Sequence, residues 1–228
     1  MKKSLTRFIP FFIAVLLLMP RAYAQKTTFT GTVVYDVKVE GDIPEQAKSM
    51  MPTEMTCKFT ADKESLLMNF GMMIQKTVYD AATQEANAMM DVMGQKLVIK
   101  SNAAELSDYK KKQNGPTIVK FTDETKTIAG YPCKKAIVTV KPEGGAESTF
   151  DVFYTDDIDL SNFKFSNPFA EINGLPLEFT MKNGPISLKL MARSIKKEKI
   201  PTSEFIIASD YKQVTSEQLK TMFGGGAE

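Results

Sequence analysis

Apolar and polar residues alternate with a period of two over much of this chain, and no other feature of the sequence limits the fold as strongly. Between residues 33 and 39 the odd positions hold Val33, Tyr35, Val37 and Val39. The same alternation returns in residues 55–60, 96–100, 150–154, 177–181 and 186–190. Successive side chains of a strand point to opposite faces of its sheet, so the pattern predicts strands with one apolar face.

Residues that favour turns separate these segments at short intervals. The clearest signal is Asn183-Gly184, because this pair readily adopts the positive φ angles of a two-residue hairpin. Further turn segments are Ala61–Lys63, Asp80–Ala82 and Glu143–Gly145. We therefore expect a sheet of about ten strands in which consecutive strands pair in an antiparallel sense.

Helical patterns are short and few. We expect one helix near Pro44–Met51, another near Ala103–Lys112, and a terminal helix at Thr215, where Thr215 and Gln218 form a capping box. So little helix cannot cover the apolar face of a long sheet, and the sheet is expected to curl over it. The predicted fold class is mainly β: a curled antiparallel sheet, or half-barrel, with a few short covering helices.

The first 24 residues have the pattern of a cleavable signal peptide. Lys2, Lys3 and Arg7 precede an apolar stretch, and Ala22-Tyr23-Ala24 provides the cleavage site. That stretch is shorter than the ~20 residues that a membrane helix needs, so we expect no membrane span and a soluble periplasmic or secreted product. The expected organisation is a signal peptide over 1–24, a single β-rich domain over 25–223 and a flexible tail over 224–228.

Charge argues against a nucleic-acid partner. Cleavage after Ala24 would remove four of the 29 basic residues, leaving 25 against 27 acidic residues and a net charge of −2. Basic and acidic residues are interspersed along the chain, whereas nucleic-acid binding needs a clustered positive field. We therefore expect no nucleic-acid binding.

Cys57 and Cys133 are the only cysteines of the chain. An oxidising compartment would allow them to pair, and we expect a structural disulfide between neighbouring strands. The alternative is two buried free thiols.

A curled sheet that its helices do not fill encloses an apolar cavity, and such a cavity can hold a hydrophobic ligand. The alternative is a filled core without a cavity; an apolar cavity of ~300 Å³ or more would favour the ligand. The candidate lining residues come from the apolar faces of the predicted strands: Val33, Tyr35, Phe59, Met68, Phe70, Leu97, Ile99, Phe150, Tyr154, Phe179, Met181, Leu188 and Leu190.

Methionine is concentrated in one part of the chain. Nine of the 12 methionines outside residues 1–24 fall between residues 50 and 93. Their flexible side chains suit an apolar site that repacks around its ligand. Thioethers also bind Cu(I), but no histidine is present to assist, and ordinary core packing is the simplest interpretation.

The complete absence of histidine limits the chemistry of the chain. It excludes a Ser-His-Asp or Cys-His catalytic arrangement and a two-histidine metal site. The acidic cluster Asp156, Asp157 and Asp159 lacks the spacing and glycine of an EF-hand calcium loop and is explained more simply as a turn. We therefore predict no catalytic residue, no metal site and no cofactor.

The segment Thr125-Lys126-Thr127-Ile128-Ala129-Gly130-Tyr131-Pro132-Cys133-Lys134-Lys135-Ala136 resembles the hairpin motif of a family of exported Gram-negative proteins, a domain of unknown function. Shorter matches include Gly31–Tyr35, Asn167–Phe169, Gly174–Glu178 and Ser209–Lys212. More distantly, the family resembles the LolA/LolB-type periplasmic lipoprotein carriers. This resemblance implies an open, curled antiparallel sheet with an apolar cavity, while Cys57 departs from the apolar residue expected at its position.

The sequence thus supports two main functional hypotheses. The first is a non-enzymatic binding protein whose cavity holds a lipid, the acyl chain of an acylated protein or another hydrophobic molecule. The second is a structural or interaction protein of the cell envelope with a filled core and no small ligand. An enzyme that relies on carboxylates alone is a third alternative.

Overall fold

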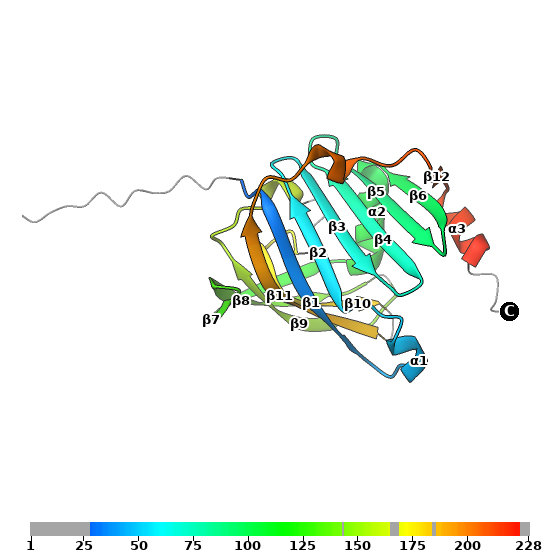
Figure 1. The fold of residues 1–228 in the computed structure, drawn as a ribbon. Coiled ribbons are helices and arrows are strands. Elements are labelled where there is room, and N and C mark those ends of the chain that lie inside the picture. The colour runs from blue at the N-terminus through cyan, green and yellow to red at the C-terminus, as the bar shows by residue number, and fades with distance from the viewer. Residues whose placement is uncertain (1–27, 143, 165–168, 184–185, 224–228) are drawn as a thin grey trace, which may run out of the picture.

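The computed structural model describes residues 28–142, 144–164, 169–183 and 186–223. Within these residues, twelve strands form a single, almost entirely antiparallel sheet that curls without closing (Figure 1). Three short α-helices and two 3₁₀ helices accompany the sheet. The predicted fold class, a curled half-barrel with few helices, is confirmed, with two strands more than expected.

The N-terminal half of the sheet is a meander in which each strand pairs with the next along the chain. Its strands are β1 Gly31–Glu40, β2 Glu54–Phe59, β3 Lys63–Asn69, β4 Met73–Asp80, β5 Glu85–Val92 and β6 Gln95–Ser101. The C-terminal half repeats this arrangement with β7 Thr117–Ile128, β8 Tyr131–Val140, β9 Ser148–Thr155, β10 Leu175–Asn183 and β11 Ile186–Lys197. The predicted hairpin joins β10 and β11, which pair as far as Asn183 and Ile186; its glycine lies outside the described residues.

Strands β1 and β11 join the two halves by pairing along the full length of β1, from Gly31 opposite Lys197 to Glu40 opposite Ser187. The short strand β12, Lys212–Gln213, runs parallel to β6. The order across the sheet is therefore β12-β6-β5-β4-β3-β2-β1-β11-β10-β9-β8-β7, and the two edges are β12 and β7.

Gly31 is needed where β1 begins to pair with β11. A Cβ atom at this position would lie 2.1 Å from the backbone oxygen of Lys196. This separation is far shorter than a carbon–oxygen contact, so any other residue would force the strands apart.

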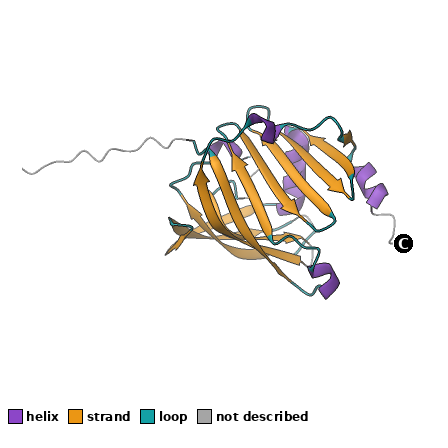
Figure 2. Ribbon diagram, viewed as in Figure 1, coloured by secondary structure: helices purple, strands orange, loops and turns teal. Residues whose placement is uncertain are grey.

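The helices lie where the sequence predicts them. They are α1 Glu45–Lys48, α2 Ala103–Asn114 and α3 Ser216–Phe223, with the 3₁₀ helices η1 Ser161–Phe163 and η2 Thr202–Phe205. The expected capping box at α3 is confirmed, since Gln218 N donates to Thr215 Oγ1 at 3.1 Å and Thr215 N donates to Gln218 Oε1 at 2.9 Å. Helix α2 connects β6 to β7 and lies on the hollow side of the curl (Figure 2).

The alternating pattern separates an inner from an outer face. Val33, Tyr35 and Val37 of β1 are buried, and their neighbours across the pairing with β2, Met55 and Cys57, are buried with them. This inner face forms the main hydrophobic core together with the residues that connect β9 to β10. The pattern therefore predicts correctly which side chains of these strands face inward.

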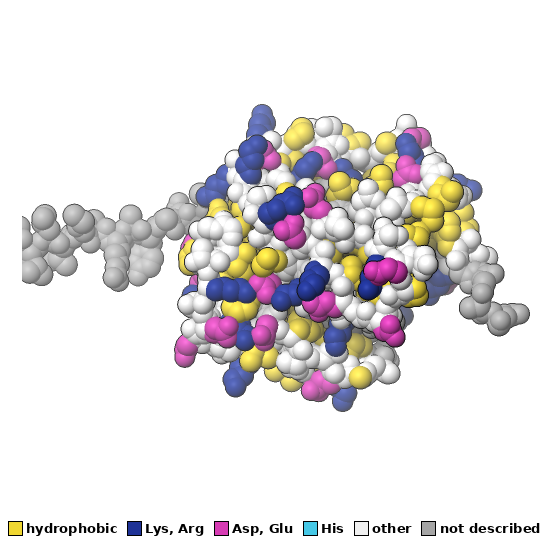
Figure 3. Space-filling model, turned by 60° about the horizontal axis from the view of Figure 1, so that its bottom comes forward, with side chains coloured by type: hydrophobic (Ala, Val, Ile, Leu, Met, Phe, Trp, Pro, Cys, Tyr) yellow, Lys and Arg dark blue, Asp and Glu magenta, His cyan; other side chains and the backbone are white. Residues whose placement is uncertain are grey.

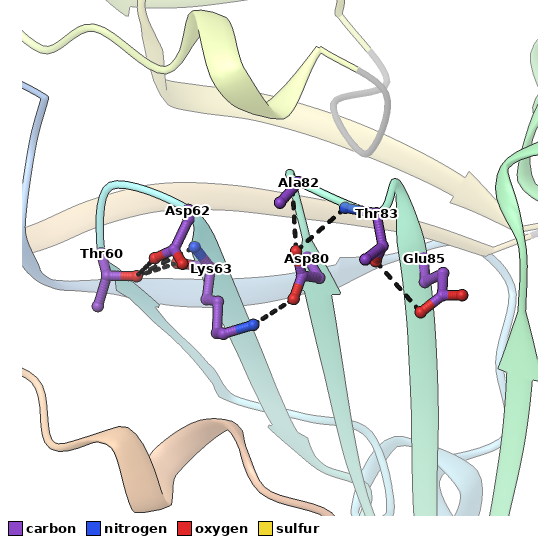
Figure 4. A network of polar contacts seen from close by, with 7 residues as sticks. All are labelled: Thr60, Asp62, Lys63, Asp80, Ala82, Thr83 and Glu85. Atoms are coloured by element: carbon purple, nitrogen blue, oxygen red, sulfur yellow. Dashed lines mark hydrogen bonds and ion pairs between the residues drawn. The ribbon is translucent and has the colours of Figure 1, made fainter.

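Polar residues hold the turns at one end of the N-terminal meander (Figure 4). Asp80 at the end of β4 accepts backbone hydrogen bonds from Ala82 at 2.9 Å and Thr83 at 3.3 Å, and its other oxygen pairs with Lys63 of β3. In the preceding turn, Lys63 N donates to Thr60 Oγ1 at 3.0 Å. These bonds fix the register of neighbouring hairpins.

The outer face carries a second, smaller cluster of apolar side chains. The C-terminal segment, residues 199–214, crosses this face and packs three side chains on three strands. We call this group the outer cluster; it consists of Val78, Met89, Val98, Phe205, Ile207 and Tyr211.

Glu204 anchors the C-terminal segment to the outer face. Its carboxylate lies 2.7 Å from Lys58 Nζ and 2.6 Å from Lys76 Nζ, and it accepts a hydrogen bond from the buried Ser65 Oγ at 3.2 Å. Burial alone would raise the pKa of Glu204, but the hydrogen bonds from Lys58 and Lys76 outweigh it and hold the pKa below its ordinary value. The segment is thus tied to β2, β3 and β4 at one point.

The expected disulfide between Cys57 and Cys133 is wrong. Both thiols are free and buried. Cys57 lies on β2 and Cys133 on β8, and four strands (β1, β11, β10 and β9) lie between them in the sheet. Alternation indicates the face of a side chain but not which strands adjoin, and this is why the prediction failed.

No helix in the described parts of the chain is long and apolar enough to cross a membrane. On the face shown in Figure 3, basic and acidic side chains lie interspersed, with hydrophobic side chains scattered among them. The signal peptide expected over residues 1–24 and the tail expected over 224–228 lie outside the described residues.

Replacing Glu204 with glutamine should lower the free energy of unfolding by about 1–3 kcal/mol at pH 7, because two lysines lose a charged hydrogen-bond partner. The lowered pKa means that this stabilisation is fully present above the unfolded-state pKa of about 4.3 and is lost as the pH falls through the folded-state pKa. Urea denaturation should therefore show the two proteins converging below about pH 4.

Asp210→Asn is the matched control, since Asp210 lies on the same segment and pairs with Lys96 at 2.6 Å on an exposed surface. Its cost at pH 7 should be clearly smaller than that of Glu204→Gln, because solvent screens an exposed ion pair. Equal stabilities of wild type and Glu204→Gln at pH 7 would contradict the anchoring role.

Thiol titration should find two free cysteines after unfolding without reductant. In the folded protein neither should react readily, because burial raises the pKa of both thiols and keeps them protonated. A protein without free thiols after unfolding would show that the two cysteines do pair.

Candidate apolar binding cavity

A cavity of about 100 Å³ lies on the inner side of the curl, between the first strands of the N-terminal meander and β10. The strands β1 to β4 provide one wall. Strand β10 and the connection from β9 to β10 provide the other. The lining residues are Tyr35, Met55, Cys57, Phe59, Glu64, Leu66, Tyr79, Leu160, Phe163, Phe169, Leu175, Pro176, Phe179 and Met181.

Aromatic rings in edge-to-face contact form much of the cavity wall. The rings of Tyr35 and Phe179 have centroids 5.6 Å apart, those of Phe169 and Phe179 5.5 Å, and those of Phe59 and Phe163 6.0 Å. The Tyr35 hydroxyl donates to the backbone oxygen of Pro176 at 2.8 Å. Strands from opposite halves of the sheet are thus held together across the cavity.

The connection between β9 and β10, which includes the 3₁₀ helix η1, packs apolar side chains on the hollow side of the curl. Ile158, Phe163 and Ile172 of this connection are among the most deeply buried residues. Asn162 of η1 donates through Nδ2 to the Ala61 backbone oxygen at 3.0 Å, which attaches η1 to the turn between β2 and β3. This attachment places Phe163 against Phe59.

We expected the cavity between the sheet and its helices, and this expectation needs correction. Helix α2 provides none of the lining residues, and most of its side chains are exposed. Its sequence, Ala-Ala-Glu-Leu-Ser-Asp-Tyr-Lys-Lys-Lys-Gln-Asn, has almost no apolar face to bury. An irregular segment with no periodic pattern covers the sheet instead.

Glu64 and Tyr79 are the polar exceptions in the lining. They lie opposite each other on β3 and β4, and Glu64 is also opposite Phe59 of β2. Burial raises the pKa of Tyr35, Cys57 and Tyr79, and the negative charge of Glu64 raises all three further. At neutral pH these three groups are therefore uncharged.

Four of the candidate residues identified from the sequence line the cavity: Tyr35, Phe59, Phe179 and Met181. Six others are buried elsewhere: Val33, Met68, Leu97, Tyr154, Leu188 and Leu190. Phe70 and Phe150 are partly buried against the main core. Ile99 is also only partly buried, on β6 near the sheet edge.

Ten of the described lining residues were not among the candidates predicted from the sequence. Met55, Cys57 and Leu66 could have been found, because they share the inner faces of strands β2 and β3. Leu160, Phe163 and Phe169 lie in the irregular connection, where no periodic signal marks them.

The methionine-rich region is not a cavity lining. Of its nine methionines only Met55 lines the cavity. Met72 and Met93 are more than half exposed, and Met89 packs in the outer cluster. Ordinary packing and surface positions account for most of these residues.

A second cavity, of about 250 Å³, lies between α2, the start of β7 and residues 170–171, and its lining includes Lys110, Lys111 and Glu171. Lys110 donates to the Lys164 backbone oxygen at 3.1 Å. Groups of both charges border the same space, so this cavity favours no single class of ligand.

The described residues contain no group of three or more acidic or cysteine side chains that could hold a metal ion. In the acidic cluster, Asp156 forms an ion pair with Lys134 at 2.7 Å, and Asp159 accepts a backbone hydrogen bond from Ser161 at 2.9 Å. These contacts agree with the interpretation of this segment as a turn.

Comparison with known proteins does not place the chain in a group. Neither a scan against models of protein families nor a search of curated proteins found a match.

Proposed function

We propose that this protein is a non-enzymatic binding protein that holds a small apolar group, such as the end of an acyl chain, in the cavity between β1–β4 and β10. The observation that carries the proposal is a mainly apolar cavity on the inner side of the curled sheet, with six aromatic rings in its described lining. Both halves of the sheet contribute residues to the cavity. The polar exceptions in its described lining are Glu64 and Tyr79, because Tyr35 belongs to the aromatic wall.

The volume of the cavity limits what it can hold. Sites for drug-sized ligands occupy about 300–1,000 Å³, and an engineered apolar cavity of about 150 Å³ binds benzene. At about 100 Å³ this cavity falls short of the ~300 Å³ that would favour a lipid-sized ligand and is smaller than the cavity that binds benzene. It is therefore too small for a whole lipid and has room only for a short alkyl chain. The proposal is therefore narrower than the sequence suggested.

We place this function outside the cytoplasm, in the periplasm or after secretion. The support is the signal-peptide pattern of residues 1–24, with Lys2, Lys3 and Arg7 before the apolar stretch. An exported protein with a small apolar cavity suits the transport or sequestration of an acylated molecule.

One observation favours the second candidate, an interaction protein of the cell envelope. Strand β7 is a twelve-residue edge of the sheet, with Ile118 and Phe121 largely exposed. An open edge with apolar side chains can accept an extended strand of a partner protein. The bulge near Phe121 and the lysines of β7 oppose such pairing, and for this reason we rank this function second.

Binding of hexan-1-ol to the wild-type protein tests the proposal. Burial of a hexyl chain contributes about 0.8 kcal/mol per carbon, about 5 kcal/mol in total, so the expected dissociation constant is on the order of 0.1–1 mM. Leu66→Phe should weaken binding at least about tenfold because the added ring occupies the cavity. Titrations followed by methyl NMR would measure both constants.

Leu67→Phe is the matched control, because Leu67 is the next residue of β3 and lies on the outer face with 37% of its surface exposed. It should bind hexan-1-ol like wild type, and thermal unfolding would verify that both variants fold. Absence of saturable binding to the wild type would exclude the proposed function and favour the interaction protein.

A further inference from the structure

Glu64 makes the distribution of charge in the cavity lining asymmetric. Among the described residues that line the cavity it is the only acidic one, and these residues include neither lysine nor arginine. Its neighbours in the sheet are Phe59 on one side and Tyr79 on the other. The carboxylate therefore lies within an aromatic wall.

The register of the strands places this charge toward one end of the cavity. Phe59 pairs with Gly31 at the start of β1, whereas Met55 pairs with Tyr35 further along the same strand. On the opposite wall, Phe179 and Met181 lie beyond Tyr35, at the levels of Val37 and Val39 of β1. Along the strand direction the lining changes from Glu64 and Tyr79 to Phe179 and Met181.

The lining is thus polar at one end and apolar at the other, which matches the two ends of an amphipathic molecule. A carboxylate accepts hydrogen bonds from an ammonium or hydroxyl group and attracts a positive charge. It repels another carboxylate, and the repulsion is stronger in a cavity with few water molecules than in bulk water. The effect of Glu64 on the pKa of Tyr35, Cys57 and Tyr79 agrees with a charge felt throughout the cavity.

We propose that the cavity selects a short-chain amine or alcohol with its polar group at Glu64 and its alkyl chain toward Phe179 and Met181, and rejects the corresponding carboxylic acid. This inference rests on the proposed function, since it assigns the ligand class of the same cavity. It narrows the ligand to molecules whose head group is neutral or positive.

Three ligands with the same alkyl chain and different head groups test the inference: hexylammonium, hexan-1-ol and hexanoate at pH 7. Wild type should bind hexylammonium at least about tenfold more tightly than hexanoate. NMR should show the alkyl chain by shifts of the Met181 methyl group and the head group by shifts of the Tyr79 ring.

Glu64→Gln keeps the size of the side chain and removes its charge. In this variant the preference for hexylammonium over hexanoate should fall to within about threefold, while hexan-1-ol binding changes little. The matched control is Glu85→Gln, which makes the same change in net charge at an exposed position at the start of β5. This control should keep the preference of the wild type.

Equal binding of hexylammonium and hexanoate to the wild type would overturn the inference. A preference for hexylammonium that stays unchanged in Glu64→Gln would also overturn it. In both cases binding of hexan-1-ol would leave the proposed function intact. If none of the three ligands binds, the proposed function and the inference both fail.

Discussion

The pairing of β1 with β11 is the interaction on which the rest of the structure depends. It connects a strand near the start of the described chain with one near its end, and ten consecutive residues of β1 take part. Without it the two meanders would be separate sheets, each with an uncovered apolar face. Because β1 lies between β2 and β11, the inner face runs without interruption from one half to the other. Gly31 permits the close approach at which this pairing begins.

The curl that results brings residues distant in sequence into one lining. Tyr35 of β1 and Phe179 of β10 meet edge to face, and the hydrogen bond from Tyr35 to Pro176 secures the contact. The connection between β9 and β10 then packs on the inner face through Phe163 and Phe169. It leaves a cavity of about 100 Å³, which is enough for a small apolar group. The proposed binding of a ligand therefore depends on the space that the connection between β9 and β10 leaves unfilled on the hollow side of the curl.

The sequence predicted the parts of the structure that arise from local periodicity. Val33, Tyr35, Phe59 and Phe179 all face inward because a strand alternates its faces, whatever its neighbours are. The capping box of Thr215 and Gln218 is equally local. The order of the strands depends on contacts across more than a hundred residues, so the distance between Cys57 and Cys133 could not be obtained from alternation.

The same distinction explains what was missed in the cavity. Phe163 and Phe169 lie in a segment without periodicity, so nothing in their spacing indicated that they cover the sheet. Glu64 was overlooked although it lies in a strand with a periodic pattern. It occupies an inward position of β3, where the pattern leads one to expect an apolar residue, and this departure from the pattern marks the one charge of the lining. A polar residue at an inward position is thus a signal in its own right.

The proposed function requires the apolar cavity on the inner side of the curled sheet to accept a guest molecule. A crystal structure determined under xenon pressure tests it most directly, since xenon enters preformed apolar cavities and is visible in the electron density. We expect a xenon atom in contact with Tyr35, Phe59 and Phe179. Xenon bound only elsewhere, with side chains filling the space between these rings, would contradict it.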